Sequence, residues 1–340
     1  MHYSFINFVL LVIIILIIIV ILSCIFKQYI IIKGYVNDIL DRTKSLIPSI
    51  VSIDDDEIIY PDMIPECMNI NMLHNVFSKE LSIFLSNTIK SSYNISIKQD
   101  SYNPDYIEYI KSIGNNGHLI KLINNESSYH TYNSNNHKTS NIYILSYRGT
   151  ISNNDLLTDL DSVQIPFIGI NNKFNKLGAL AHRGFTEYWT EHKQDINNII
   201  DSKLILPNDT LIITGHSLGC SSAAMTALAL GSSSYFRNIK IKLYMFAPPR
   251  VGNHIFMEEL EHYVPDNWAI INKSDLITEL PPVTLPTIGN NWLYDNWKNR
   301  IIIDIQLGSI LLNHKMSTYI CGLDDMHECA VTPIWYRNYN

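Results

Sequence analysis

A serine lies between two glycines at the end of an apolar, β-branched run. The stretch Leu211–Cys220 reads LIITGHSLGC, and Ser217 is the centre of a G-x-S-x-G pattern with Gly215 and Gly219. The residues before it predict a strand and the small residues after it predict a helix, so the serine would occupy a sharp strand-to-helix turn. Side chains at the two glycine positions would collide with neighbouring backbone. Ser217 is therefore a candidate nucleophile, and a simple Gly-Ser turn into a buried helix is the alternative.

A nucleophilic serine needs a general base and an acid that orients the base. Asp275 follows the apolar run 268–272, and His314 lies in LLNHKMSTYI further along the chain. As alternatives, His327 lies between acidic residues that indicate a solvated loop, and Asp304 lies inside the strand-like run IIIDIQL, where it would be hard to aim. We therefore favour Asp275 and His314, which gives the order serine, aspartate, histidine that is typical of α/β-hydrolases.

The residues beside the serine suggest different roles. The backbone N–H of Leu218, at the start of the predicted helix, is placed to stabilise negative charge on an oxyanion. His216 precedes the serine, and a residue in that position usually points away from the nucleophile. We therefore interpret His216 as a packed structural histidine.

Strands and helices alternate through the part of the chain that must position these residues. This alternation predicts an α/β fold with a mostly parallel central sheet and helices on both faces, over residues 75–340. The expected helices are 75–93, 184–201, 220–230 and 253–264, and the expected strands are 118–123, 142–147, 210–214, 239–247 and 268–272.

The N-terminus differs in composition from the rest. After a short tail, 1–4, the segment Phe5–Phe26 carries no charge. As a helix it would rise about 33 Å, enough to cross a bilayer. We expect one transmembrane helix over 5–26, followed by a juxtamembrane connector over 27–74 that contains an acidic run and prolines. A lipoprotein box at 21–24 fits less well, because the apolar run continues past its cysteine.

The side of the membrane on which the domain lies stays open. Basic residues follow the apolar segment and none precedes it, which favours a cytosolic domain. Four N-x-S/T sequons, which would matter only in a lumen, begin at Asn94, Asn125, Asn208 and Asn272. In a chain this rich in asparagine, such matches also arise by chance.

Composition excludes several classes of function. The 340 residues carry a formal net charge of −7, and no basic patch indicates a nucleic-acid partner. The five cysteines are too few and too scattered for a disulfide scaffold. We expect free thiols rather than a bridge between Cys321 and Cys329. No Cys/His spacing predicts a metal site, so we expect neither metal nor organic cofactor.

Six motifs occur in an order that resembles the class 3 lipases, a family that includes fungal triacylglycerol lipases, plant phospholipases A1 and sn-1-specific diacylglycerol lipases. The resemblance covers about residues 75 to 325 and implies an α/β-hydrolase fold. The motifs are SYRGTISNNDLLTDL, AHRGFTEYW, ITGHSLG, FAPPRVGN, NKSDLITELPP and HKMSTYI, the last similar to an H-x(4)-Y segment.

The resemblance implies a role for each matched residue. Ser217 would attack an ester carbonyl, His314 would accept and return the proton, and Asp275 would orient the histidine. Thr150 would join Leu218 as an oxyanion donor. Asp155 or Asp159 would brace the Thr150 loop, although both also fit a solvated surface, and His182 would be structural.

The stretch after Thr150 corresponds to the lid of the fungal members. The apolar face of a short lid helix would consist of Ile151, Leu156, Leu157 and Leu160, although these residues also fit an ordinary core. The family often has a tryptophan in the lid, and Leu156 or Leu157 stands there instead, which puts interfacial activation in doubt.

These features together predict a membrane-anchored serine lipase or esterase that hydrolyses glycerolipid acyl esters. One alternative is a catalytically silent hydrolase fold that serves as a membrane-tethered scaffold. Another is an esterase or acyltransferase that acts on phospholipids or on non-lipid esters. The sequence gives no protein partner.

Overall fold

The structure, a computed structural model, describes residues 76–93, 107–114, 116–123, 141–149, 163–169, 178–287 and 290–324, without the side chains of 285–292. All of them belong to the unit Ile58–Asn340. The predicted tail, anchor and connector over 1–74 lie outside the described residues. Within the described part of the chain, no helix has the length and apolar character needed to span a bilayer.

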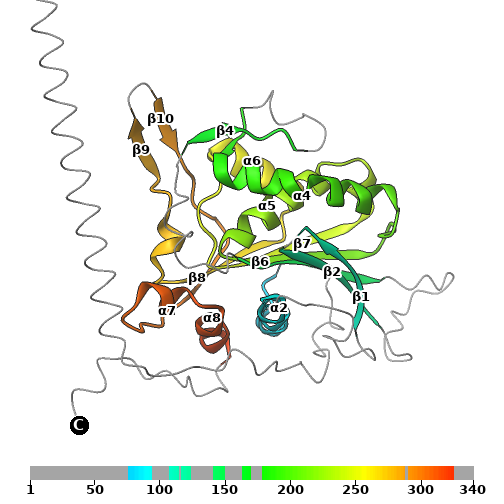
Figure 1. Ribbon diagram of the computed structural model, residues 1–340, viewed down its shortest axis with the longest axis horizontal. Coiled ribbons are helices and arrows are strands. Elements are labelled where there is room, and N and C mark those ends of the chain that lie inside the picture. The colour runs from blue at the N-terminus through cyan, green and yellow to red at the C-terminus, as the bar shows by residue number, and fades with distance from the viewer. Residues whose placement is uncertain are drawn as a thin grey trace, which may run out of the picture. The chain divides into compact units, whose positions relative to one another are not determined.

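A twisted sheet forms the centre of the described fold (Figure 1). Seven strands pair in the order β1-β2-β3-β6-β7-β8-β11. The neighbours from β3 to β11 are parallel, and β1 and β2 are antiparallel at one end. The strands are β1 Ile107–Ile113, β2 Gly117–Leu122, β3 Ile142–Tyr147, β6 Thr210–His216, β7 Lys240–Phe246, β8 Asn267–Asn272 and β11 Arg300–Ile303.

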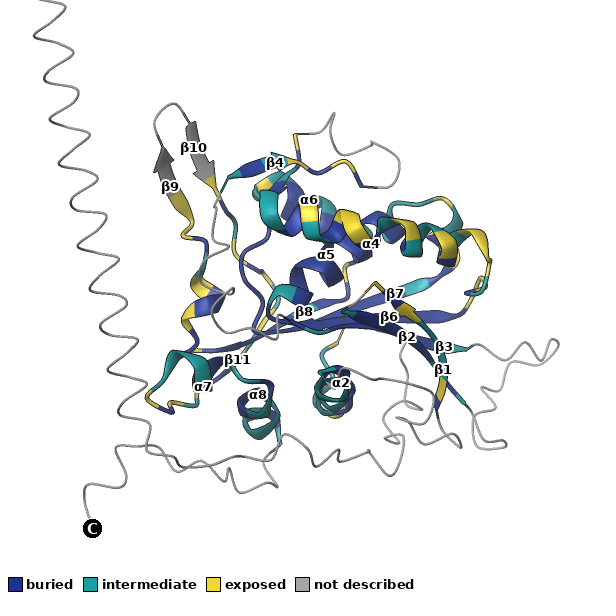
Figure 2. Ribbon diagram, in the orientation of Figure 1, coloured by how far each residue is buried: buried dark blue, intermediate teal, exposed yellow. Residues whose placement is uncertain are grey.

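Helices cover both faces of the sheet (Figure 1). One face packs against α4 Arg183–Asp201, α5 Leu218–Gly231 and α6 His254–Tyr263, and the other against α2 Lys79–Ser92 and α8 Met316–Leu323. Because apolar residues cover it on both sides, β6 is buried along its whole length (Figure 2). This topology is that of an α/β-hydrolase, as the sequence predicted.

The remaining described elements are short. Two hairpin-like ribbons pair β4 Gln164–Pro166 with β5 Leu180–His182, and β9 Thr284–Thr287 with β10 Asn290–Leu293. Two 3₁₀ turns, η4 Tyr235–Asn238 and η5 Leu276–Glu279, and a single-turn helix, α7 Ile310–His314, complete the set.

Most of the predicted elements are confirmed. The helix expected over 184–201 begins one residue earlier, and the one expected over 253–264 is one residue shorter at each end. The helix expected over 75–93 begins at Lys79, where the Ser78 side chain accepts the Leu81 N–H as a cap. β1, the two ribbons, α7 and α8 were not predicted from the sequence.

One expectation about the cysteines is wrong. Cys321, in α8, is disulfide-bonded, and its partner lies outside the described residues. Cys220 is a buried free thiol at the start of α5, as expected.

Candidate active site

Ser217 occupies a strained turn between β6 and α5. Its backbone has φ 56° and ψ −129°, a conformation that residues other than glycine rarely adopt. A Cβ at Gly215 would lie 2.5 Å from the carbonyl oxygen of Gly219, and a Cβ at Gly219 would lie 2.4 Å from that of Tyr147. Both glycines are therefore needed because backbone from the turn and from β3 approaches them closely, which confirms the steric interpretation.

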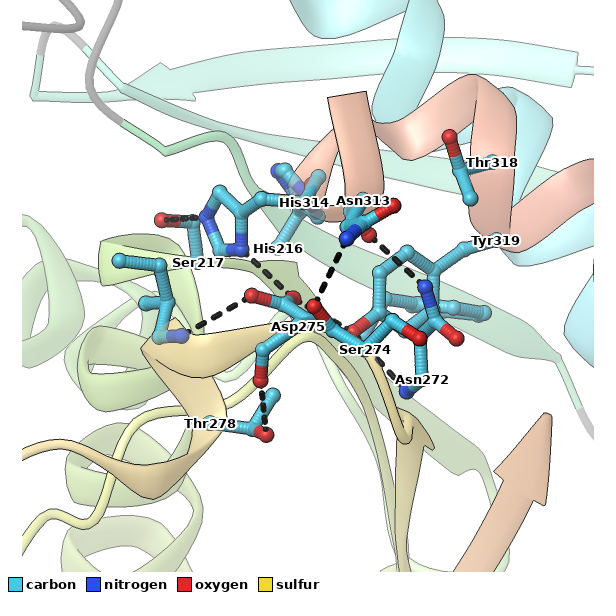
Figure 3. Close-up of polar contacts among 12 residues, drawn as sticks. His216, Ser217, Asn272, Ser274, Asp275, Thr278, Asn313, His314, Thr318 and Tyr319 are labelled. Atoms are coloured by element: carbon cyan, nitrogen blue, oxygen red, sulfur yellow. Dashed lines mark hydrogen bonds and ion pairs between the residues drawn. The ribbon is translucent and has the colours of Figure 1, made fainter. Parts of the chain in front are cut away.

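The structure brings the three predicted triad residues together (Figure 3). The Oγ of Ser217 lies 2.7 Å from Nε2 of His314, and Nδ1 of the same ring lies 2.7 Å from Oδ2 of Asp275. All three side chains are buried. A serine whose proton faces a histidine, held in turn by a carboxylate, has the geometry of an activated nucleophile.

The alternative acid is directed elsewhere. Asp304 follows β11, and its carboxylate contacts Nζ of Lys273 at 2.7 Å in an exposed ion pair. Asp275 instead lies at the carboxyl end of β8, where η5 begins and its Oδ1 accepts the Ile277 N–H. The structure thus directs Asp275 rather than Asp304 at the histidine.

Tyr319 is a fourth member of this network, to which the sequence analysis assigned no role. Its hydroxyl donates to Oδ2 of Asp275 at 2.7 Å and accepts the Asn272 N–H at 3.1 Å. Burial raises the pKa of Tyr319 well above its usual value, which keeps the phenol neutral and able to donate. Tyr319 is the tyrosine of the H-x(4)-Y motif, and that motif was the signal in the sequence.

Two buried asparagines, Asn272 and Asn313, form hydrogen bonds between the end of β8 and the segment that carries His314 (Figure 3). Nδ2 of Asn313 donates to the Ser274 carbonyl at 2.9 Å. Nδ2 of Asn272 donates to the carbonyls of Ile305 and Asn313 at 2.9 and 3.1 Å. Since Asn272 is fully buried and its amide is engaged, this sequon is closed to modification in the folded protein.

His216 is packed, as predicted, but its contacts place it within the site. Nδ1 of its ring lies 2.6 Å from the Tyr93 hydroxyl, and Nε2 lies 2.8 Å from the backbone carbonyl of His314. Burial is the main cause of a pKa lowered to about 3, so the ring is neutral at physiological pH. The Tyr93 hydroxyl also accepts the Gly149 N–H at 2.9 Å, and Tyr93 had no signal in the sequence analysis.

The two oxyanion candidates differ in what the structure describes. Leu218 is the first residue of α5, where backbone N–H groups lack a partner within the helix. Gly149 lies against Ser217, since a Cβ on it would be 2.9 Å from Cβ of Ser217. Thr150, the next residue, lies outside the described residues, as do Asp155, Asp159, the lid candidates between 151 and 160, and His327.

His182 has the structural role that was predicted for it. Its Nδ1 accepts the Phe185 N–H at 3.3 Å as the cap of α4, and its ring stacks on that of Phe185. Across the ranges that the structure describes, no cluster of three or more His, Cys, Asp or Glu side chains could hold a metal ion.

A comparison with known families adds to this geometry. The profile of the family described as Lipase (class 3) matches residues 144–285, which include Ser217 and Asp275. These residues belong to the class 3 lipase family. The matched segment holds the elbow and the acid loop, whereas His314, Tyr319 and Tyr93 lie outside it.

Three curated proteins illustrate the similarity of this class 3 lipase segment to known sequences. A secreted mono- and diacylglycerol lipase 3 of Gibberella zeae is 28% identical over 122 residues, or 34% of this chain and 38% of the relative. Phospholipase A1-II 1 of Oryza sativa subsp. indica is 24% identical over 53% of this chain and 49% of its own length. The lipase of Rhizomucor miehei is 26% identical over 46% and 42%. This chain thus spans less than half the length of each of them.

Solved structures of fungal lipases also align with the fold. A mutant form of MDLA from Penicillium cyclopium aligns with a TM-score of 0.47 at 21% identity, over 69% of this chain and 83% of that one. The lipase of Rhizopus microsporus var. chinensis aligns with a TM-score of 0.45 at 21% identity, over 60% and 69%.

Proposed function

We propose that this protein is a serine ester hydrolase that cleaves acyl esters of glycerolipids. The observation that carries the proposal is the buried chain Ser217 Oγ, His314 and Asp275, joined by two contacts of 2.7 Å on a strained elbow. The class 3 lipase segment supports the same chemistry.

The reaction follows from the positions of these atoms. Oγ of Ser217 attacks the ester carbonyl carbon while Nε2 of His314 accepts the serine proton, and Asp275 stabilises the resulting imidazolium. The N–H of Leu218 and, on our proposal, that of Thr150 bind the oxyanion. His314 returns the proton to the departing alcohol oxygen, which leaves an acyl-serine. A water molecule, deprotonated by the same histidine, then releases the fatty acid and restores Ser217.

Two considerations support a glycerolipid as substrate. The relatives carry names that specify mono- and diacylglycerol lipases and phospholipases A1, all of which denote acyl esters of glycerol. We also propose that residues 5–26 anchor the protein in a membrane, because a tether to the plane that contains the substrate raises its effective concentration.

The test compares the full chain in detergent with its Ser217→Ala variant. The first assay uses a short-chain p-nitrophenyl ester, and the second uses mixed micelles of diacylglycerol, triacylglycerol and phosphatidylcholine with products identified by mass spectrometry. We expect fatty acid release from a glycerolipid by the wild type and none above background by Ser217→Ala. Equal rates for the two proteins would overturn the proposal. Hydrolysis of the p-nitrophenyl ester without any lipid product would refute the glycerolipid assignment and leave a general esterase.

A further inference from the structure

Tyr93 and His216 form a hydrogen-bonded chain from the end of α2 to the backbone of His314. We infer that these two side chains are positioning residues, which hold Gly149, just after β3, and the backbone of His314 in place beside Ser217. This inference rests on the proposed function. Neither side chain contacts the Ser217 hydroxyl in the described structure, so both would act through the residues that they hold.

This hydrogen-bonded chain joins three parts of the fold. The Tyr93 hydroxyl, at the C-terminal end of α2, accepts the Gly149 N–H at 2.9 Å, just after β3. The same hydroxyl lies 2.6 Å from Nδ1 of His216, the last residue of β6. Nε2 of His216 lies 2.8 Å from the carbonyl oxygen of His314, in α7. An element from the start of the domain is thereby connected to the site on both sides of the nucleophile.

The partners fix the position of each proton. A carbonyl oxygen can only accept, so Nε2 of His216 must carry the proton that it donates to His314. In a neutral ring Nδ1 is then an acceptor, and the Tyr93 O–H must donate to it. The oxygen of Tyr93 still has a lone pair for the Gly149 N–H. Every donor in this hydrogen-bonded chain has one acceptor, and the hydroxyl of Tyr93 both donates to His216 and accepts from Gly149.

Close packing leaves little freedom around this chain. A Cβ on Gly149 would lie 2.8 Å from the Tyr93 hydroxyl oxygen and 3.0 Å from the His216 carbonyl oxygen. Tyr93 and His216 also meet edge to face, with ring centroids 5.9 Å apart, and the His216 and His314 rings lie 5.0 Å apart. Loss of the hydroxyl would leave both the Gly149 N–H and Nδ1 of His216 without the hydrogen-bond partner that they have in the structure. Gly149 and the backbone of His314 would then shift relative to Ser217.

The first test compares Tyr93→Phe with a matched control, Tyr143→Phe, in the full chain. Tyr143 is also buried, and its hydroxyl donates to the Leu204 carbonyl at 3.2 Å. Tyr143 lies near the beginning of β3, where it pairs with Leu211, so it is far from the end of the strand that approaches the elbow. We expect Tyr93→Phe to lower kcat about 10- to 100-fold with KM within about twofold, because small misplacements of reacting groups act on kcat. Tyr143→Phe should keep kcat within about twofold of wild type.

A second variant tests whether the two residues act as one chain. His216→Gln interrupts the same series of hydrogen bonds at its second member. The addition of Tyr93→Phe to His216→Gln should therefore lower kcat little further. Additive losses in the double variant would contradict the connection. If Tyr93→Phe does not fold, His216→Gln compared with Tyr143→Phe carries the same kcat test.

A measurement without substrate separates this inference from the proposed function. In the full chain with ¹⁵N-labelled histidine, NMR of the ring resonances reports the His314 contact with Asp275. Tyr93→Phe should shift or broaden the ring resonances of His314, and Tyr143→Phe should leave them unchanged. If the wild type hydrolyses no ester, the proposed function fails while the ring spectra still decide the positioning role. Equal kcat values and equal ring spectra for Tyr93→Phe and Tyr143→Phe would overturn the inference.

Discussion

Two aspartates near the end of neighbouring strands allow a matched test of the orienting acid. Asp275→Asn should lower kcat about 10³- to 10⁴-fold, because an amide does not hold the histidine in the same tautomer or stabilise its charge. Asp304→Asn should leave kcat near that of the wild type, because Asp304 forms an exposed ion pair with Lys273. Steady-state kinetics on a soluble ester measures both. Comparable losses in the two variants would contradict the assignment of Asp275.

Tyr319 gives a second prediction about a single residue. Tyr319→Phe removes a donor from the carboxylate of Asp275 and the acceptor of the Asn272 N–H. A hydrogen bond to a charged group contributes about 1.5–3 kcal/mol. We therefore expect kcat to fall by about one order of magnitude or more, while Ser217 remains reactive. A kcat equal to that of the wild type, with an unchanged melting temperature, would exclude a role for this hydroxyl.

The sequence could indicate the triad but not the residues that support it. Ser217 has a glycine on each side of the elbow, Asp275 follows an apolar strand, and His314 begins the H-x(4)-Y motif. Tyr93 has no such local pattern, because its function depends on contacts with His216 and Gly149, which lie far from it in the sequence. Tyr319 belongs to the H-x(4)-Y motif, but its contact with Asp275, 44 positions away, is not visible in that motif. Side chains that act through long-range contacts become evident only when the fold brings them together.

At the scale of elements, the β6–α5 turn depends on close approach of backbone. Gly219→Ala places a Cβ 2.4 Å from the Tyr147 carbonyl oxygen, which must displace β3 or the helix. We expect a loss of about 1–3 kcal/mol or more in the free energy of unfolding. Ser222→Ala, in the same helix, is the control, because the buried Ser222 Oγ makes no hydrogen bond with any described residue and its removal should be near neutral. Urea unfolding of both variants measures the difference, and equal stabilities would contradict the steric account.

The long and regularly patterned elements were predicted from the sequence, and most of the short ones were not. The long helix α4 and the buried strand β6 have clear periodicity, whereas β4 and β5 have three residues each and α7 has five, too few to establish a period. β1 was missed although it has seven residues, and its pairing with β2 is interrupted by a register shift between Tyr109 and Lys111. Glu108 and Ser112 are exposed and the residues between them are half-buried, so apolar and polar residues alternate only weakly along this strand.

At the scale of the whole molecule, buried histidines predict how stability depends on pH. Burial lowers the pKa of His118 and His182 to about 4 and that of His216 to about 3. Above the unfolded value of 6.5 these rings are neutral in both states. Below it, the unfolded chain binds protons that the folded chain does not, so the free energy of unfolding falls as pH falls, by up to about 1.4 kcal/mol per pH unit for each ring.

The corresponding measurement is thermal unfolding between about pH 7 and pH 5, a window in which the histidines change charge before most carboxylates do. We expect the melting temperature to fall across this window. His118→Gln should make the dependence on pH shallower, since one proton-binding group is removed from the unfolded state. A melting temperature that stays constant from pH 7 to pH 5 would refute this prediction.

The central claim is that Ser217 is an activated nucleophile, and reaction with a fluorophosphonate probe tests it most directly. The full chain in detergent would be treated with the probe, digested, and mapped by mass spectrometry. We predict one covalent adduct, on the peptide that contains Ser217, which is absent from Ser217→Ala and forms much more slowly in His314→Ala. Labelling of Ser217→Ala to the same extent as the wild type, or no adduct on folded wild-type protein, would contradict the claim.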